Sequence, residues 1–380
     1  MSAASLPTTG RCVSEPSCCK ADVVGSLLRP PELLDARGRW LAGTLATPAY
    51  KQIEDRAVDS ALALQAQCGL DAATDGEMRR MFFTGVVTDA IDGVELTPGQ
   101  TTSWQGDDSD GNVLDIQLPV AVTGKLRRRR SLATEEFAYA RGRTDRVLKV
   151  TLPSPLMLSY FWSPEKSSSA YSDPFALFAD AAEIIHAEAH ELASLGCRYI
   201  QLDAPELITL ADPAQAAYFA NLGIDPDRML TEGVELINGC AEVPGVDFAM
   251  HLCRGNNHGK WLAEGGYEAV SRKVFPRATN IDAFALEYDS PRAGSFEALR
   301  DVPDDRRVIL GLVSTKQDVV EDKSVLAARV AEAARYFPRE QLAISTQCGF
   351  ASEQSGNPIS ESTQKAKLAL VSEMADSLRD

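Results

Sequence analysis

Short β-branched or apolar runs alternate with longer amphipathic segments along most of the chain. The segments between the runs, such as 50–67, 173–195 and 324–337, carry apolar residues at three- and four-residue spacing, as helices packed on a sheet do. The runs lie at residues 21–26, 69–77, 146–155, 198–206, 246–253, 281–288, 306–315 and 341–349. Parallel strands joined by helical crossovers produce this alternation. The pattern therefore predicts an α/β fold of the TIM (β/α)8 barrel class.

Two segments depart from this alternation. Residues 91–145 contain short strand-like stretches separated by turns, which predicts an inserted antiparallel β meander after the second strand. Residues 1–20 lack periodicity and are expected to form a flexible N-terminal arm, so that residues 21–380 make a single barrel domain. The arm contains three cysteines whose spacing matches no common zinc-binding pattern: Cys12, Cys18 and Cys19.

The composition and net charge limit which kinds of molecule the protein is expected to bind. The chain has 380 residues, of which 44% are hydrophobic and 24% charged, and this is ordinary for a globular protein. A net charge of −16 repels nucleic acid and anionic membrane surfaces. No apolar stretch approaches the ~20 residues of a spanning helix, and residues 1–20 lack the apolar core of a signal peptide. We therefore expect a cytoplasmic protein, with a homo-oligomer left open, that acts on small molecules.

Polar residues collect where the predicted strands end, which is where TIM barrels carry their functional groups. His251, Cys253, Glu287 and Cys348 supply one imidazole, two thiols and one carboxylate from three strand ends. Zinc accepts all of these ligand types, and residues i and i+2 of a strand point to the same side. The pattern predicts a zinc site at the barrel mouth, and three separately buried core residues are the alternative.

Six short motifs at or near these strand ends carry a family resemblance. The chain resembles the cobalamin-independent methionine synthase family, in particular the short proteins that correspond to its C-terminal catalytic barrel. The motifs occur in order over nearly the whole chain, which makes them far more specific together than singly. They are VGS (24–26), DGE (75–77), IQLDAPE (200–206), HLCRGN (251–256), LEYD (286–289) and QCGF (347–350).

The resemblance implies zinc as cofactor and a thiol as substrate. The ligands that it implies are His251, Cys253, Glu287 and Cys348. The zinc-bound thiolate would then attack the methyl group of a methyltetrahydrofolate or of a methylcorrinoid, and one zinc ligand must loosen to admit the substrate sulfur. Glu287 is the candidate for that ligand, because a carboxylate oxygen binds zinc less softly than a thiolate.

The resemblance also implies which residues hold the substrate. Ser26, Glu77 and Asp203 would bind the amino-acid part of a homocysteine-like thiol, and a carboxylate facing an ammonium group is sensible chemistry in its own right. Asp203 is a catalytic candidate together with Glu287. His258, five residues after Cys253, is a third candidate, for a substrate contact or a proton carrier.

Three departures from the family concern the alkyl donor. Full-length members carry an additional N-terminal barrel associated with folate, for which this chain leaves no room. The histidine expected after the seventh strand is replaced by the stretch GLVSTKQD (311–318), so Lys316 or Asp318 would have to protonate the leaving group. Asp203 is followed by Ala204 and Pro205 where an adjacent Glu is usual.

These departures keep two other functions open. The first is that of the related epoxyalkane:coenzyme M transferases, in which a zinc-bound thiolate opens an epoxide. The second is a non-enzymatic barrel with a structural zinc.

Three further features have simpler interpretations. His186 and His190 lie on a helix that is expected to face solvent, and Arg127 to Arg130 are expected to form a solvated turn. Aromatic residues near 82 and near 161 could line a substrate pocket or pack the barrel against its helices.

Overall fold

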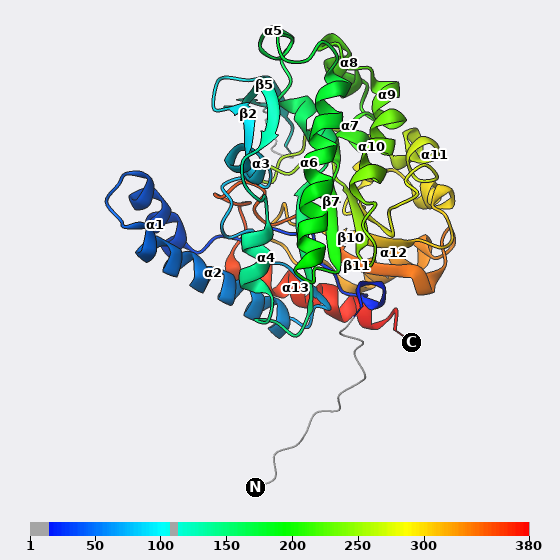
Figure 1. The fold of residues 1–380 in the computed structure, drawn as a ribbon. Helices are drawn as coiled ribbons and strands as arrows, with labels where there is room; N and C mark the ends of the chain where they lie inside the picture. Colours follow the sequence, from blue (N-terminus) through cyan, green and yellow to red (C-terminus); the bar gives the residue numbers. More distant parts are fainter. Residues whose placement is uncertain (1–14, 107–112, 380) are drawn as a thin grey trace.

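The computed structural model describes residues 15–106 and 113–379 (Figure 1). Most of the expected flexible arm, including Cys12, lies outside the described residues, and so do residues 107–112 of the predicted insertion. The described end of the arm contains the short 3-10 helix η1 (Pro16–Cys18), and the side chain of Cys19 is buried. Among the helices of residues 15–106 and 113–379, none is both long and apolar enough to cross a membrane.

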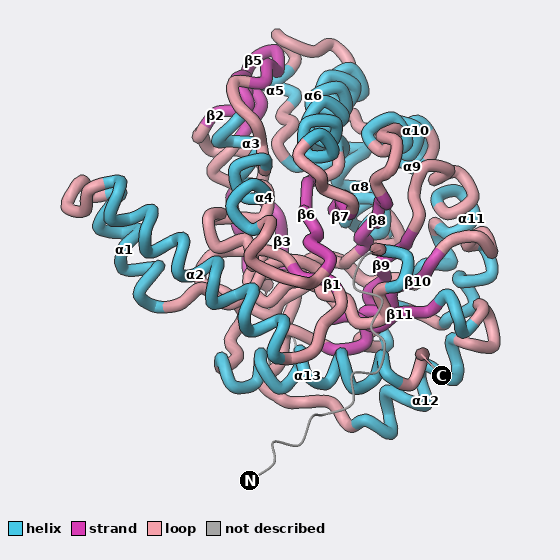
Figure 2. The backbone as a smooth tube through the Cα atoms, turned by 60° about the horizontal axis from the view of Figure 1, so that its bottom comes forward, coloured by secondary structure: helices cyan, strands magenta, loops and turns pink. Residues whose placement is uncertain are grey.

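Seven parallel strands form one sheet that curls on itself (Figure 2). Each strand pairs with the next along the chain in a parallel register, as expected when helical crossovers join them. The strands are, in sheet order, β1 (Ala72–Ala73), β6 (Val147–Pro153), β7 (Tyr199–Asp203), β8 (Asp247–Leu252), β9 (Ala283–Glu287), β10 (Arg307–Val313) and β11 (Leu342–Thr346).

The first predicted run lies between the two edges of this sheet. Ala21 forms a parallel bridge with Ile344 of β11, and the Asp71 backbone N–H, next to β1, donates to the Ala21 carbonyl over 2.9 Å. This arrangement is consistent with a TIM-like barrel, and all eight predicted runs contribute to it. The predicted α/β class is therefore confirmed.

Helices cover the outside of the sheet (Figures 1 and 2). Helix α6 illustrates how the sequence produces them: the Asp173 side chain accepts a hydrogen bond from the Phe175 N–H, and Pro174 occupies the first turn. The longer helices are α1 (Pro31–Leu41), α2 (Thr47–Gln67), α6 (Pro174–Ser194), α8 (Pro213–Asn221), α10 (Glu232–Cys240), α12 (Lys323–Ala333) and α13 (Glu361–Asp376). Shorter ones are α3 (Gly85–Ala90), α4 (Thr134–Ala140), α5 (Pro164–Ser167), α7 (Pro205–Thr209), α9 (Pro226–Leu230) and α11 (Ser271–Val274).

The insertion is antiparallel, but its strands are nested. Strand β2 (Ile91–Glu95) pairs with β5 (Ala121–Arg128), and β3 (Thr101–Trp104) pairs with β4 (Leu114–Gln117) between them. A meander would pair each strand with its neighbour in sequence, so the described residues do not confirm the predicted meander. Pro98 and Pro119 lie in the two connections and lack the N–H that a continuous ladder needs.

The two ends of the barrel differ in what fills them. Near the N-terminal ends of the strands, a packed cluster of mostly small apolar side chains fills the interior, including Ala72, Val147, Tyr199, Ala249, Ala283, Ile309 and Ala343. A buried ion pair lies within the same barrel, where the Lys149 ammonium is 2.8 Å from the Asp22 carboxylate. A cavity lies at the opposite end, at the C-terminal ends of the strands, which is where TIM barrels carry their functional groups.

Candidate metal centre and active site

Three of the four predicted ligands meet at the C-terminal end of the barrel. His251 belongs to β8, Cys253 follows the end of that strand, and Cys348 lies two residues after β11. Their ligand atoms lie within 4.8 Å of one another, and all three side chains are buried. The two sulfur atoms are 3.9 Å apart. The strand-end argument from sequence therefore placed these residues in one cluster.

The donor atoms of this cluster fit zinc. The His251 Nδ1 lies 3.3 Å from the carbonyl oxygen of Ala285, which can only accept, so Nδ1 donates there and Nε2 is the ring nitrogen left to face a metal. Within the described chain this buried Nε2 has no hydrogen-bond partner. The hydrogen bond between the two sulfurs, aided by His251 and opposed by burial, holds the pKa of Cys348 well below its ordinary value. One imidazole and two sulfurs, one of them a thiolate, form a donor set that zinc prefers.

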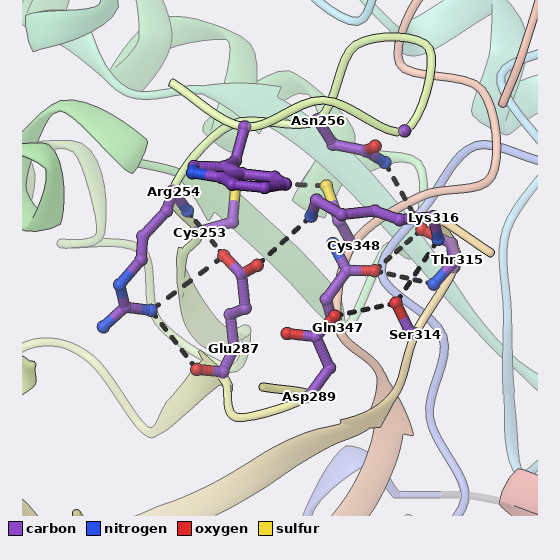
Figure 3. A network of polar contacts seen from close by, with 12 residues as sticks. Cys253, Arg254, Asn256, Glu287, Asp289, Ser314, Thr315, Lys316, Gln347 and Cys348 are labelled. Atoms are coloured by element: carbon purple, nitrogen blue, oxygen red, sulfur yellow. Dashed lines mark hydrogen bonds and ion pairs between the residues drawn. The ribbon is translucent and has the colours of Figure 1, made fainter. Parts of the chain in front are cut away.

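The fourth predicted ligand, Glu287, points elsewhere (Figure 3). Its Oε1 is 3.2 Å from the Lys316 ammonium, and its Oε2 accepts a hydrogen bond of 2.6 Å from the Arg254 backbone N–H. Burial opposes the carboxylate charge, but Lys316 and Arg254 outweigh it and lower the pKa of Glu287. Its role as a zinc ligand stays a prediction, and it requires the carboxylate to move away from Lys316.

A hydrogen-bond network holds the loop that carries Cys348. The Gln347 side-chain oxygen accepts from both the backbone N–H and the hydroxyl of Thr315, each at 2.8 Å. The Asn256 amide donates to the Gly349 carbonyl at 2.7 Å. Figure 3 shows this network beside the two cysteines. The loops after β8, β10 and β11 are thereby fixed to one another, which positions the cluster.

The three predicted substrate-binding residues lie beside the cluster and are all buried. Ser26 accepts a hydrogen bond from the Ala351 N–H through its Oγ. Glu77 has a left-handed backbone with φ of 54°, a strained conformation that is typical of functional sites. Its Oε1 accepts from Thr151 at 2.8 Å, whereas its Oε2 is buried without a hydrogen-bond partner in the described chain. That free oxygen can accept from an ammonium group.

Asp203, the last residue of β7, carries the most informative shift in pKa among these residues. Burial raises the pKa of its carboxyl to about 7, against the opposing influence of His251, and the Glu77 charge adds to the rise. Its Oδ1 accepts a hydrogen bond of 2.7 Å from Gln201. A bound ammonium group would lower this pKa and complete the charge balance.

The cluster opens into a cavity of about 420 Å³. This volume is in the range that small-molecule sites occupy. The predicted residues Ser26, Glu77 and Asp203 line it together with the three cluster residues. Residues of the insertion, including Trp104 and Ile116, form part of its wall, and so do aromatic residues from both groups noted in the sequence. The site therefore has room for more than one small molecule.

Other predicted residues lie outside this cavity. His258 lies near its rim, where Nε2 is 3.3 Å from the Ser355 hydroxyl and 3.8 Å from the Glu353 carboxylate. Lys316 is held by Glu287, and Asp318 accepts hydrogen bonds from Ser360. Neither of these two candidate acids lines the cavity.

The two histidines and the run of four arginines noted in the sequence contact neighbouring side chains. His186 and His190 pack edge to face on helix α6, with ring centroids 4.6 Å apart. The four arginines from Arg127 to Arg130 pair with acidic residues of neighbouring elements, namely Asp89, Asp92, Glu188 and Glu191.

Sequence reasoning did not find Trp104. It lies in β3 of the insertion, and its ring reaches across to the loop after β8: a Cβ added at Gly255 would be 2.8 Å from the Trp104 Cζ3 atom. Two backbone hydrogen bonds between Gln105 and Trp261, of 2.7 and 3.0 Å, fix the insertion to this loop. The only sequence signal was Gly255 itself, a small residue two positions after Cys253.

Comparisons with known proteins agree with this fold. A family model described as "Cobalamin-independent synthase, Catalytic domain" matches residues 20–371. The uncharacterized protein YxjG of Bacillus subtilis is 34% identical over 363 residues, covering 94% of each chain. A methionine synthase of Saccharolobus solfataricus is 24% identical over 329 residues, covering 86% of each chain.

A solved structure shares the fold. The B12-independent methionine synthase from Shewanella sp. W3-18-1, in complex with selenomethionine, superimposes with a TM-score of 0.72 at 21% identity, over 95% of this chain and 97% of that one. The fold and the cluster at the barrel mouth thus define an α/β barrel with a candidate metal site. The chain belongs to the cobalamin-independent methionine synthase family and corresponds to its catalytic domain.

Proposed function

We propose that this protein is a zinc-dependent S-methyltransferase that methylates a homocysteine-like thiol. One observation carries the proposal: the cluster of His251, Cys253 and Cys348 opens into the cavity that Ser26, Glu77 and Asp203 also line. Metal ligands and amino-acid-binding groups therefore face the same enclosed space. The barrel from residue 21 onward would act as one catalytic domain on a small thiol and an alkyl donor.

The protein's own groups bind and orient the thiol substrate. The ammonium of a homocysteine-like molecule is held by Glu77 and Asp203, and Ser26 is within the same cavity for its carboxylate. The substrate sulfur is thereby directed at the cluster. Zinc held by His251, Cys253 and Cys348 supplies one piece of chemistry, the removal of the thiol proton at neutral pH, which turns the thiol into a nucleophile. Glu287, which is paired with Lys316 here, would hold the zinc only if its carboxylate left Lys316, so the substrate sulfur could bind in its place.

Coenzyme M fits the cavity less well than an amino acid. Its sulfonate is an anion, and among the described residues that line the cavity none is lysine or arginine. Two carboxylates beside the cluster favour a substrate with an ammonium group instead. A cavity that reaches the cluster also argues against a purely structural zinc, because structural zinc sites leave no position open to a substrate.

Metal analysis combined with proton release tests this proposal. We expect about one zinc per chain, and release of about one proton per zinc when homocysteine is added at pH 7, because a free thiol with a pKa near ~8.5 is protonated there. Adding coenzyme M should cause far less proton release. Protein that contains zinc but releases no proton with homocysteine would contradict the proposed function.

Replacing Glu77 with Gln should weaken binding of the thiol substrate. The change removes the charge that faces the substrate ammonium and keeps the shape, and a charged hydrogen bond is worth about 1.5–3 kcal/mol, so the KM for homocysteine should rise about 10- to 100-fold. Steady-state kinetics measures this. As control, a thiol without an amino group, such as 3-mercaptopropionate, should bind both proteins equally. An unchanged KM for homocysteine would remove Glu77 from the site.

A further inference from the structure

The wall of the cavity is aromatic and acidic. Among the described residues that line it, the charged side chains other than those of the metal cluster are all carboxylates, and neither lysine nor arginine is present. The carboxylates are Glu77, Asp203 and Glu353. The aromatic side chains are Phe82, Phe83, Trp104, Tyr160 and Phe161, and the large aliphatic ones are Ile116, Leu118, Met157 and Leu262. Aromatic rings and carboxylates that line one cavity favour a cation as ligand.

The aromatic wall lies close to the reacting end of the cavity. The Trp104 ring lies against Gly255, which is two residues after Cys253. Gly255 has a positive φ of +89°, and a side chain at this position would also collide with the Trp104 ring. Two backbone hydrogen bonds between Gln105 and Trp261 hold the insertion in place. An indole ring therefore lines the cavity near Cys253.

The rim of the cavity adds a further negative charge. Glu353 forms an antiparallel backbone bridge with Phe82, and both residues line the cavity. One carboxylate oxygen of Glu353, Oε2, accepts a hydrogen bond of 2.9 Å from the Ser355 backbone N–H and lies 3.8 Å from His258 Nε2. With Glu77 and Asp203 assigned to the ammonium of the thiol substrate, Glu353 and the aromatic residues remain for the second substrate. This part of the cavity is suited to positive charge and unsuited to the carboxylates of a folate.

The leaving group gives an independent argument. A folate must be protonated as it leaves, and neither Lys316 nor Asp318, the two replacements for the missing histidine, lines the cavity. A donor whose leaving group is stable without a proton fits these surroundings better.

We infer that the alkyl donor is a small methylated onium cation, a sulfonium or a quaternary ammonium, held between the aromatic wall and Glu353. This inference rests on the proposed function. In the transfer, a new bond forms between the thiolate sulfur and the methyl carbon while the bond from that carbon to the onium centre breaks. The bonding electrons stay with the onium atom, which leaves as a neutral thioether or tertiary amine. The charges of thiolate and onium cancel, so no proton, oxidant or reductant is needed.

Donor competition on the zinc-loaded protein tests the inference. Homocysteine is supplied with S-methylmethionine, dimethylsulfoniopropionate, glycine betaine or methyltetrahydrofolate, each with an isotopically labelled methyl group, and labelled methionine is measured by mass spectrometry. We expect label from at least one onium donor, and the sulfonium and ammonium arms tell the two sources apart. Label from methyltetrahydrofolate alone, or from none of the onium donors, would overturn the inference.

A binding measurement gives a second readout that does not require turnover. Choline and its uncharged analogue 3,3-dimethylbutanol have nearly the same shape, so calorimetric titration of both isolates the effect of charge. We expect choline to bind at least about tenfold more tightly, since a desolvated cation–π contact is worth about 2 kcal/mol. Equal affinities would argue against a cation site.

Two tryptophan substitutions, one in the cavity wall and one outside it, serve as test variant and control. Trp104→Leu should raise the KM for the onium donor about tenfold and leave the KM for homocysteine unchanged. Trp40→Leu, on helix α1 away from the cavity, should change neither. Proton release on adding homocysteine separates the two proposals: if it is absent, the proposed function fails, and if it is present while all onium donors fail, only the donor inference fails.

Discussion

Replacing Cys348 with Ser should remove most of the bound zinc and nearly all transferase activity while the barrel stays folded. Cys348 supplies the thiolate of the cluster, and it lies in a loop after β11 and not in the packed interior. Loss of residues that merely support metal ligands costs about 10- to 100-fold in affinity, so loss of a ligand should cost at least about 100-fold. Zinc per chain after dialysis against a chelator, together with circular dichroism, measures both effects.

Cys240 provides a matched control. It is buried in α10, and its sulfur lies 3.6 Å from the Ala182 carbonyl, which a serine hydroxyl can also reach. Cys240→Ser should therefore keep its zinc and its activity, with at most a small loss of stability. If Cys348→Ser retained its full zinc content under the same dialysis, the ligand assignment would be wrong.

Much of the fold follows from local patterns in the sequence. The alternation of apolar runs and amphipathic segments located all eight barrel positions, because each pattern reflects which face of an element is buried. Parallel strands place their C-terminal ends side by side at one face of a barrel. The positions of His251, Cys253 and Cys348 at or after strand ends therefore predicted that they lie together, as they do in the structure. Both inferences depend only on chain direction and periodicity.

The remaining features depend on contacts that no local pattern encodes. Glu287 lies at a strand end as expected, but its orientation is decided by Lys316 from the loop after β10 and by the Arg254 backbone. Trp104 comes from an insertion whose strands pair in a nested order, so its place in the cavity wall follows from long-range pairing. A sequence pattern can place a residue on an element, but it cannot choose between partners on other elements.

Replacing Lys316 with Met should destabilise the zinc-free protein and make its stability depend more strongly on zinc. Lys316 and Glu287 are both buried, and removing one member of a buried ion pair typically costs about 3–5 kcal/mol. Arg254 still faces Glu287, so the lower end of that range is expected. Freed from Lys316, the Glu287 carboxylate can take the fourth ligand position, so zinc should restore more stability to the variant than it adds to the wild type.

Lys367 offers the control for this experiment. Its buried ammonium is 2.9 Å from the Glu321 carboxylate, away from the cluster. Lys367→Met should also lose stability, but zinc should raise its melting temperature only as much as that of the wild type. Thermal unfolding with and without zinc measures all three proteins.

Lys316→Met also tests whether Glu287 competes with the substrate for binding to zinc. If Glu287 binds zinc once Lys316 is removed, homocysteine must displace the Glu287 carboxylate. X-ray absorption at the zinc edge should then show an added sulfur ligand in the variant only at higher homocysteine concentrations than in the wild type. Should zinc stabilise Lys316→Met and the wild type equally, Glu287 is not a ligand, and the site is completed by the substrate sulfur alone. The Lys316–Glu287 pair would then serve only to balance charge beside the cluster.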